Sequence, residues 1–522
     1  MKKTALLLSV ILALGCTACG KDTPAGSNSE EGGSPAAPAE AKPRTCYEEF
    51  SAFSGTEGRI DTACSFSEEG VAWVYLTDST LFSGNNAHHA VYAINTSGEV
   101  LFKLYENTGL SLNLFGGLQS VSAFCRGVAL AKTQSSGIYD LKEEWDKLSG
   151  GSSQTDKEQS DTLLVNTEGK VLWSMNKDGK EQAEKIFGAG NVETVEMAEN
   201  NFNNFNGYAA VKIHVNSFDT TGDYYTVLKP DGTFLMEPVK ANEFQMWSGK
   251  IYAEWQGDYV DGGDNYHYIN LLTGETVDAK REVGTFIMNP QPAVPDGGWE
   301  QVQIWQNEYD RSNQDGLLYD QNVHGFTDKD GNVVIDLSEY TLYDEKYRYN
   351  DEKEKTLYFN SNGQYMVFNT LDSNKSKIAP PRFHNGYAVV TIRNQDDAPF
   401  FVIYDTKGEK VCQPTKYPNI SKIPANAYYA DGYVVFTQTN SIYGTYSDDP
   451  VFYMYTSSNA DGSTPIPLFY TLDGQPASSL GSYCGAFPFS QGIAQVLDPE
   501  SNERFFIDKN GSKLFQSAAN AE

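Results

Sequence analysis

The chain has 522 residues and a formal net charge of −30, from 69 acidic and 39 basic side chains. This acidity excludes nucleic acid as a partner, because nucleic-acid binding needs Lys and Arg to neutralise phosphates, and it disfavours direct adhesion to anionic lipid. Aromatic residues make up 13% of the chain and glycine occurs 46 times, a composition typical of strands and turns.

Residues 1–18 have the features of a secretory signal peptide, with a positive start at Met1-Lys2-Lys3 and an apolar run from Ala5 to Leu14. That run is too short to span a bilayer as a mature helix. Gly15-Cys16-Thr17-Ala18-Cys19-Gly20 follows and resembles the lipobox of bacterial lipoproteins. The resemblance implies that Cys19, with Cys16 as the alternative, carries a lipid that anchors the protein on the bacterial cell surface. An ordinary signal peptide with incidental cysteines is the other interpretation.

Residues 19–44 consist largely of Gly, Ser, Pro, Ala and Glu, with no large apolar residue. Such a segment cannot bury a core, so it is predicted to be a disordered tether. The remaining residues, 45–522, are predicted to form one β-repeat domain.

Five cysteines follow Cys19, and their odd number and wide spacing do not indicate a disulfide scaffold. Cys46 and Cys64 are near enough in sequence to close one short loop, and whether they form a disulfide is left open. Buried free thiols are predicted for the other three, Cys125, Cys412 and Cys484.

A two-part sequence motif, which we call the phrase, recurs along the chain. The first part is a glycine that opens a short apolar strand, as in Phe383-His-Asn-Gly-Tyr-Ala-Val-Val390. The second part is an apolar strand that breaks at Asn/Asp-x-x-Gly and resumes, as in Val91-Tyr-Ala-Ile-Asn-Thr-Ser-Gly-Glu-Val-Leu-Phe102. An Asx side chain can bond the backbone ahead of it, and glycine tolerates the left-handed conformation of a short hairpin loop. Each phrase therefore predicts at least three antiparallel strands.

About eight such phrases lie between residues 60 and 515, and Gly363 opens a further, truncated one. The predicted fold is all-β, with repeated antiparallel hairpin units arranged as a β-propeller of seven or eight blades. The alternative is an open β-repeat superhelix of the same hairpins.

Residues 383–412 and 487–515 carry the phrase most fully, and they resemble the WG-repeat family of bacterial β-repeat proteins. Residues 91–102 also resemble the hairpin of quinoprotein-type propeller blades. These resemblances imply a binding scaffold rather than a shared reaction. No cofactor-binding set accompanies them, so no cofactor is predicted.

Two inserts have helical features. Leu141, Trp145 and Leu148 fall on one face at helical spacing, which predicts a helix within 139–148, and residues 178–189 predict a second one. The first is expected to pack on the rim of the repeats, with a partner-docking helix as the alternative.

The usual catalytic and metal-binding motifs are missing from the sequence. The six histidines form no His-x-x-x-His pair, and Gly-x-Ser-x-Gly does not occur, so neither a zinc hydrolase nor a serine hydrolase is indicated. The acidic turns at 327–332 and at Asp258, Asp261 and Asp264 are the two places where calcium ligands could gather. The first fits poorly, because Phe326 and Leu337 fall where carboxylates are needed, and no metal is predicted.

Four tryptophans gather in the central repeats, within loops expected from 244 to 305, and are the candidate ligand-binding aromatics: Trp247, Trp255, Trp299 and Trp305. Rings of this kind stack on sugars, but core packing uses the same residues. The sequence therefore predicts a lipid-anchored binding or protein-interaction module without catalytic activity, for an unknown protein or glycan ligand. The alternative is a carbohydrate-binding or glycan-cleaving propeller protein.

Overall fold

The computed structural model describes residues 44–78, 87–108, 121–132, 161–198, 205–218, 220–246, 249–257, 263–282, 297–320, 322–342, 357–361, 364–368, 381–393, 399–416, 426–437, 467–483, 485–498 and 503–515. All of them belong to one compact body, Pro43–Glu522. The predicted signal peptide, Cys16, Cys19 and nearly all of the tether lie outside the described residues.

The described chain begins with a short helix, α1 (Cys46–Ser54). Thr45 and Glu48 form a reciprocal capping box at its start, and Gly55 ends it in the left-handed conformation. Phe50 and Cys46 are fully buried against the first sheet. The Thr-x-x-Glu capping pattern for this helix is present in the sequence, yet the helix lies within residues 45–522, which the sequence was expected to fold entirely as β-repeats.

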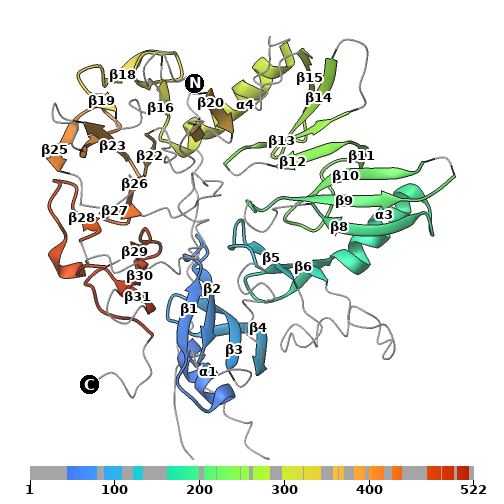
Figure 1. Cartoon of the computed structure of the whole chain (residues 1–522), viewed down its shortest axis with the longest axis horizontal. Coiled ribbons are helices and arrows are strands. Elements are labelled where there is room, and N and C mark those ends of the chain that lie inside the picture. The colour runs from blue at the N-terminus through green and yellow to red at the C-terminus, as the bar shows by residue number, and fades with distance from the viewer. Residues whose placement is uncertain are drawn as a thin grey trace, which may run out of the picture. The chain divides into compact units, whose positions relative to one another are not determined.

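Eight groups of strands then follow one another in the described residues, and we number them repeats 1 to 8 (Figure 1). Every pairing between the named strands is antiparallel. The groups are, in order, β1 (Arg59–Ala63), β2 (Val71–Thr77), β3 (His88–Asn95) and β4 (Val100–Thr108); β5 (Val128–Lys132), β6 (Thr162–Asn166) and β7 (Val171–Ser174); β8 (Val192–Met197), β9 (Ala209–Val215), β10 (Gly222–Leu228) and β11 (Val239–Lys240); β12 (Glu243–Met246), β13 (Tyr252–Gln256), β14 (Gly263–Asn270) and β15 (Thr276–Glu282); β16 (Leu318–Asp320), β17 (Gly325–Thr327) and β18 (Val333–Asp336); β19 (Thr341–Leu342), β22 (Phe383–His384), β23 (Tyr387–Arg393), β24 (Pro399–Asp405) and β25 (Lys410–Lys416); β26 (Asn426–Ala430), β27 (Tyr433–Thr437) and β28 (Phe469–Tyr470); β29 (Gly485–Ala486), β30 (Ile493–Leu497) and β31 (Arg504–Asp508).

The prediction of an all-β fold built from repeated antiparallel units is confirmed. A separate hairpin, β20 (Leu357–Ser361) with β21 (Gln364–Phe368), occupies the place predicted for the truncated phrase at Gly363. The helix predicted within 178–189 is α3 (Lys180–Phe187), which continues a π-helical turn, η4 (Met175–Gly179). The helix predicted within 139–148 lies outside the described residues.

The Asx-x-x-Gly turns have the predicted geometry. In repeat 1 the Asn95 side-chain oxygen accepts hydrogen bonds from the N–H groups of Ser97 and Glu99. Gly98 donates its N–H to the carbonyl of Asn95 and has a φ of 76°. The same side-chain bonds recur at Asn166, Asp328, Asp405 and Asp508. The glycines are thus fixed by hairpin stereochemistry.

These glycines have a second role at the junctions between repeats. A Cβ on Gly169 of repeat 2 would lie 2.7 Å from the ring of Phe102, on the outer strand of repeat 1. We call each such place, where the turn glycine of one repeat lies against the outer segment of the preceding repeat, a glycine seat. Seven seats are occupied by described residues, at Gly98, Gly169, Gly232, Gly274, Gly408, Gly474 and Gly511.

The turns that open the repeats also touch from one repeat to the next. Arg126, Asn385, Asp431 and Gln491 each have positive φ and precede a positive-φ glycine, the pattern of a two-residue type I′ turn. The Arg126 side chain donates to the carbonyl of Asn206, and that of Gln491 to the carbonyl of Glu68. The Asp431 carboxylate accepts from the N–H of Gly492 at 2.6 Å.

The last repeat joins the first. β31 pairs with β1 through Ile60 and Arg504, so that β29 to β31 and β1 to β4 form one seven-stranded sheet. Phe515, which follows β31, fills the seat at Gly98. The succession of repeats therefore returns to its start, as a propeller requires and an open superhelix does not.

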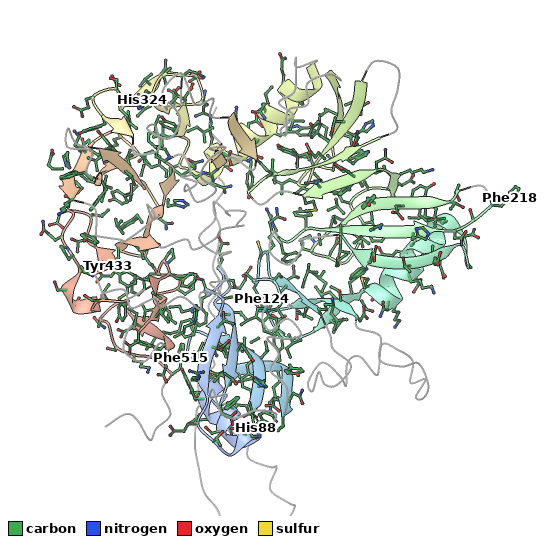
Figure 2. The ribbon with its side chains drawn as sticks, viewed as in Figure 1. His88, Phe124, Phe218, His324, Tyr433 and Phe515 are labelled. Atoms are coloured by element: carbon green, nitrogen blue, oxygen red, sulfur yellow. The ribbon has the colours of Figure 1, made fainter. Side chains whose placement is uncertain are left out.

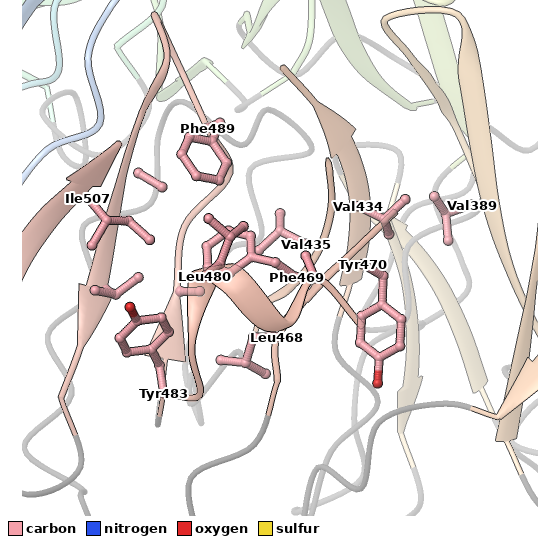
Figure 3. Close-up of a cluster of buried hydrophobic side chains, with 14 of the residues drawn as sticks. Val389, Val434, Val435, Leu468, Phe469, Tyr470, Leu480, Tyr483, Phe489 and Ile507 are labelled. Carbon is pink, nitrogen blue, oxygen red and sulfur yellow. The ribbon is translucent and has the colours of Figure 1, made fainter. Parts of the chain in front are cut away.

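Adjacent repeats share their cores. Figure 3 shows one such cluster, in which Val389 of β23, Val434 of β27, Phe469 of β28 and Ile507 of β31 are buried together. Burial of this cluster holds repeats 6, 7 and 8 to one another.

One junction is different. Between repeats 4 and 5 the chain inserts α4 (Gly297–Asn313). Val302 and Trp305 of α4 are buried in the core of repeat 4, and Arg311 donates to the carbonyl of Thr327 in β17 at 2.7 Å. The helix is therefore joined to both repeats. Where residues 244–305 are described, the expected loops are instead strands β12 to β15, the short turns between them and the start of this helix.

Candidate functional site

Repeat 3 presents a charged face. Alternation along β9 buries Val211, Ile213 and Val215 and leaves Lys212 and His214 half-buried on the other side. His214 lies between two carboxylates, with Nδ1 2.7 Å from Asp223 Oδ1 and Nε2 3.5 Å from Glu193 Oε2.

Lys212 extends this arrangement. Its Nζ is 3.2 Å from Asp223 Oδ2 and 3.2 Å from Glu196 Oε1. The hydrogen bond from His214, with that from Lys212, lowers the pKa of Asp223. The hydrogen bond to Asp223 in turn raises the pKa of Lys212. Both groups are held in their charged forms. We call Glu193, Glu196, Lys212, His214 and Asp223 the repeat 3 network.

This network suits recognition rather than nucleophilic catalysis. A His–Asp pair activates a nucleophile when a hydroxyl or thiol faces its second nitrogen. Here, in the described part of the chain, the group on that side of His214 is the carboxylate of Glu193. The arrangement can donate and accept hydrogen bonds and carries a net negative charge.

A row of stacked rings continues from repeat 3 into repeat 4. Tyr225 of β10 stacks on Phe244 of β12 with ring centroids 5.6 Å apart. Phe244 stacks on Trp255 at 6.0 Å, and Trp255 on His267 at 5.2 Å. The last three residues are directly opposed on neighbouring strands, and Asp278 of β15 ends the row, 2.6 Å from His267 Nδ1.

This row accounts for Trp255, whose ring has Phe244 on one side and His267 on the other, with only 7% of the residue exposed. Trp305 packs in the same core with 6% exposed. Trp299 lies in the first turn of α4 without a described side chain, and Trp247 lies outside the described residues. The structure therefore brings Trp255 and Trp305 into one core, where packing occupies them.

The tip of the β9–β10 hairpin carries an exposed ring. Phe218 is fully exposed, and Figure 2 shows its side chain pointing away from the protein. The Ser217 hydroxyl lies 2.6 Å from that of Thr220, and Thr221 donates to the carbonyl of Ser217. The Phe218 ring is therefore exposed to solvent on a hairpin tip that is held together by these hydrogen bonds.

The remaining candidates have structural roles where they are described. Cys46 and Cys64 are free thiols in different clusters, and burial raises the pKa of each to about 12. Cys412 is buried, Cys125 is half-buried, and Cys484 lies outside the described residues.

The acidic turn at 327–332 is occupied by its own hydrogen bonds, because the Asp328 carboxylate accepts from the backbone of Asp330 and Asn332. Asp264 lies in β14, while Asp258 and Asp261 fall outside the described residues. Within the described ranges, no three His, Cys, Asp or Glu side chains gather to hold a metal ion. In the same ranges no helix is long and apolar enough to cross a membrane.

Sequence reasoning did not find the repeat 3 network or Phe218. The alternation in Val211-Lys-Ile-His-Val215 was a readable signal for an exposed Lys and His on one side of a strand. Their carboxylate partners come from neighbouring strands, and only the strand register brings them together.

No protein-family model matches the chain, and no curated protein matches it. Among solved structures, the chain is similar to the β-propeller domain of the trilobed protease from Pyrococcus furiosus, at 10% identity and a TM-score of 0.25, covering 73% of this chain and 91% of that one. It is similar to the acylaminoacyl peptidase of Pyrococcus horikoshii at 9% identity and a TM-score of 0.25, covering 74% of this chain and 50% of that one. It is also similar to a PL25 ulvan lyase at 8% identity and a TM-score of 0.23, covering 88% and 96%. Likenesses this weak carry no argument about activity, and the fold assignment rests on the strand pairings described above.

Proposed function

We propose that the protein is a lipid-anchored, extracytoplasmic binding module that recognises a polar ligand, most simply another protein, without catalysing a reaction. The observation that carries the proposal is the repeat 3 network. His214 and Lys212 each lie between two carboxylates on a half-exposed face. The group next to His214 Nε2 is the carboxylate of Glu193, whereas nucleophilic catalysis would need a hydroxyl or thiol there. Paired charges of this kind give specificity at an interface.

A protein ligand is favoured over a glycan by the ring row. Sugar recognition uses an open ring face, whereas Phe244 and Trp255 each have rings on both sides. The second candidate function, glycan binding or cleavage, would have to use other rings.

A binding experiment separates these functions. The full chain is crosslinked in the cells that produce it, and partners are compared between wild type, His214→Ala and His88→Ala. His88 is the matched control, because its Nδ1 lies 2.7 Å from Asp78 in repeat 1. Loss of a partner with His214→Ala alone supports the proposal. A glycan-array hit that purified protein converts to product would contradict it.

The lipid anchor has a test of its own. Globomycin should block processing of the wild-type precursor, and a Cys16/Cys19 double variant should leave the membrane fraction. Unchanged processing under globomycin, or a double variant that stays in the membrane fraction, would remove the anchor from the proposal and leave the binding function standing.

A further inference from the structure

One face of the β9–β10 hairpin is covered at its start and exposed toward its tip. At the start, Ala210 of β9 and Val227, directly opposite it on β10, are buried in the core of repeat 4. Two residues further along the same face, Lys212 lies opposite Tyr225, whose ring stacks on Phe244 of β12. Repeat 4 therefore covers this face only as far as Tyr225.

The next pair on this face, His214 and Asp223, is directly opposed, and their side chains are 38% and 37% exposed. Phe218 follows His214 by four residues, so their Cα atoms are at most about 14 Å apart. A standard protein–protein interface covers about 800 Å² of each partner, which is a patch roughly 30 Å across. The repeat 3 network and Phe218 therefore fit within one interface, and we call them together the hairpin face.

The hairpin face carries an excess of negative charge. Its three carboxylates lie beside one lysine and one histidine, so the excess persists even when His214 is protonated. Glu193 and Glu196 belong to β8, the last strand of the described sheet, and their side chains are 56% and 52% exposed. Exposed carboxylates of this kind accept hydrogen bonds from guanidinium and ammonium groups.

Phe218 adds an apolar anchor to this charged face. Its ring is fully exposed and points away from the protein (Figure 2). Burial of a phenylalanine side chain contributes on the order of 1.5–3 kcal/mol, and large rings are typical anchors of protein interfaces. The hydrogen bonds that Ser217 makes with Thr220 and Thr221 already connect the two sides of the tip, which reduces the ordering that binding requires.

We propose that the hairpin face docks a partner protein that presents a cationic side chain, such as arginine, to Glu193 and Glu196 and an apolar recess to Phe218. This inference rests on the proposed binding function and specifies the chemistry of its partner. Charge complementarity selects this occupant. An anionic membrane surface would repel the carboxylates. In a two-fold dimer formed through this face, the carboxylates of one copy would meet those of the other.

Photo-crosslinking from the hairpin tip tests the proposal in the cells that produce the protein. The full chain carries Phe218→p-benzoyl-phenylalanine, and the adduct is mapped by mass spectrometry. It should be a protein adduct, on an apolar segment beside an exposed Lys or Arg. The same substitution at Ile186 is the control and should not give this adduct. Ile186 is 48% exposed on α3, which packs on the opposite face of the sheet.

Removal of the negative charge should weaken the adduct. Glu193→Gln combined with Glu196→Gln should lower its yield about tenfold, because the cation of the partner then loses its carboxylates. Glu181→Gln combined with Glu184→Gln is the matched control. It removes two charges from α3 and should leave the yield unchanged.

A second measurement does not depend on the folding of any variant. Once the adduct has identified the partner, the affinity of the purified partner for the wild type should fall about tenfold between about 0.05 and 0.5 M NaCl, because salt screens exposed charges.

Five results would overturn the inference. They are an adduct with lipid, an adduct with a second copy of the chain, no adduct at position 218, a yield unchanged by the Glu193 and Glu196 substitutions, and an affinity insensitive to salt. If any of them is found while His214→Ala still loses a partner in cells, the binding function stands and only the partner chemistry assigned here is refuted.

Discussion

The ring of Phe515 lies against Gly98 so closely that the glycine has no room for a Cβ atom. Phe515 follows the last strand and Gly98 is in the turn of the first repeat, so this contact joins the two ends of the array. Phe515 also meets Phe66 of repeat 1 and Phe506 of β31 edge-on, with centroids 6.4 and 5.5 Å away. The closure therefore uses the same packing as the internal junctions.

Replacing Phe515 by Ala should destabilise the protein by about 2 kcal/mol, because a partly buried ring that fills the closing seat is lost. Urea unfolding followed by tryptophan fluorescence measures the loss. Phe218→Ala is the control, since that ring is fully exposed and its removal should change the free energy of unfolding by less than about 0.5 kcal/mol. Equal effects of the two substitutions would contradict the closing role of Phe515.

Comparing Gly169→Ala with Gly331→Ala separates the two roles of the turn glycine, which are to adopt a positive φ and to leave room for a side chain of the preceding repeat. Both glycines have a φ of 80°, so each substitution should cost about 1 kcal/mol for placing an L-residue in the left-handed region. Gly169→Ala should cost about 1–3 kcal/mol more, because the new methyl group would collide with Phe102. The difference between the two variants in urea unfolding is the quantity to measure. Identical losses would show that the seat contributes nothing.

His384 should make the protein sensitive to mild acid. Burial, with the nearby charge of Arg382, lowers the pKa of His384 to about 3. The unfolded chain protonates this ring near pH 6.5, while the folded protein keeps it neutral. The free energy of unfolding should therefore fall as the pH drops below 6.5, by about 2 kcal/mol at pH 5.

Unfolding of wild type and His384→Gln at pH 7 and pH 5 checks this effect. The variant should lose less stability than the wild type between the two pH values, whatever its stability at pH 7. A pH slope unchanged by His384→Gln would show that another group is responsible.

Cys46 and Cys64 should remain reduced and unreactive in the folded protein. Both thiols are buried, with their pKa raised to about 12, so little thiolate is available at neutral pH. Iodoacetamide should alkylate them only after denaturation, as mass spectrometry of peptides can show. A linked Cys46–Cys64 peptide from unreduced protein would contradict the structure.

The hairpins of this fold could be predicted from the sequence. Asn95 and Gly98 predicted a hairpin because the Asx bonds and the left-handed glycine act within five residues. The contacts at the glycine seats could not be predicted from the sequence, because the residue that lies against Gly169 is Phe102, which belongs to a different repeat. α4 was missed although Val302, Trp305 and Tyr309 have helical spacing, because its aromatic residues were interpreted as loop residues.

The candidate site was less predictable than the fold. Trp255 and Trp305 were selected as large rings, and ring chemistry alone does not distinguish a platform from a core residue. His214 was one of six scattered histidines, and its significance comes from Asp223 and Glu193, which the strand register places beside it.

The closing turn also determines how the protein would respond to mechanical force. The carbonyl of Arg44 accepts from the N–H of Val100, and Cys46 donates to the carbonyl of Gly98, so the chain enters the structure on the turn that Phe515 covers. A pull on the chain ahead of Arg44, such as a membrane anchor would exert, first loads these hydrogen bonds. Phe515, which follows the last strand, packs against the same turn. Unfolding repeat 1 by such a pull would therefore also require breaking its contact with the last repeat.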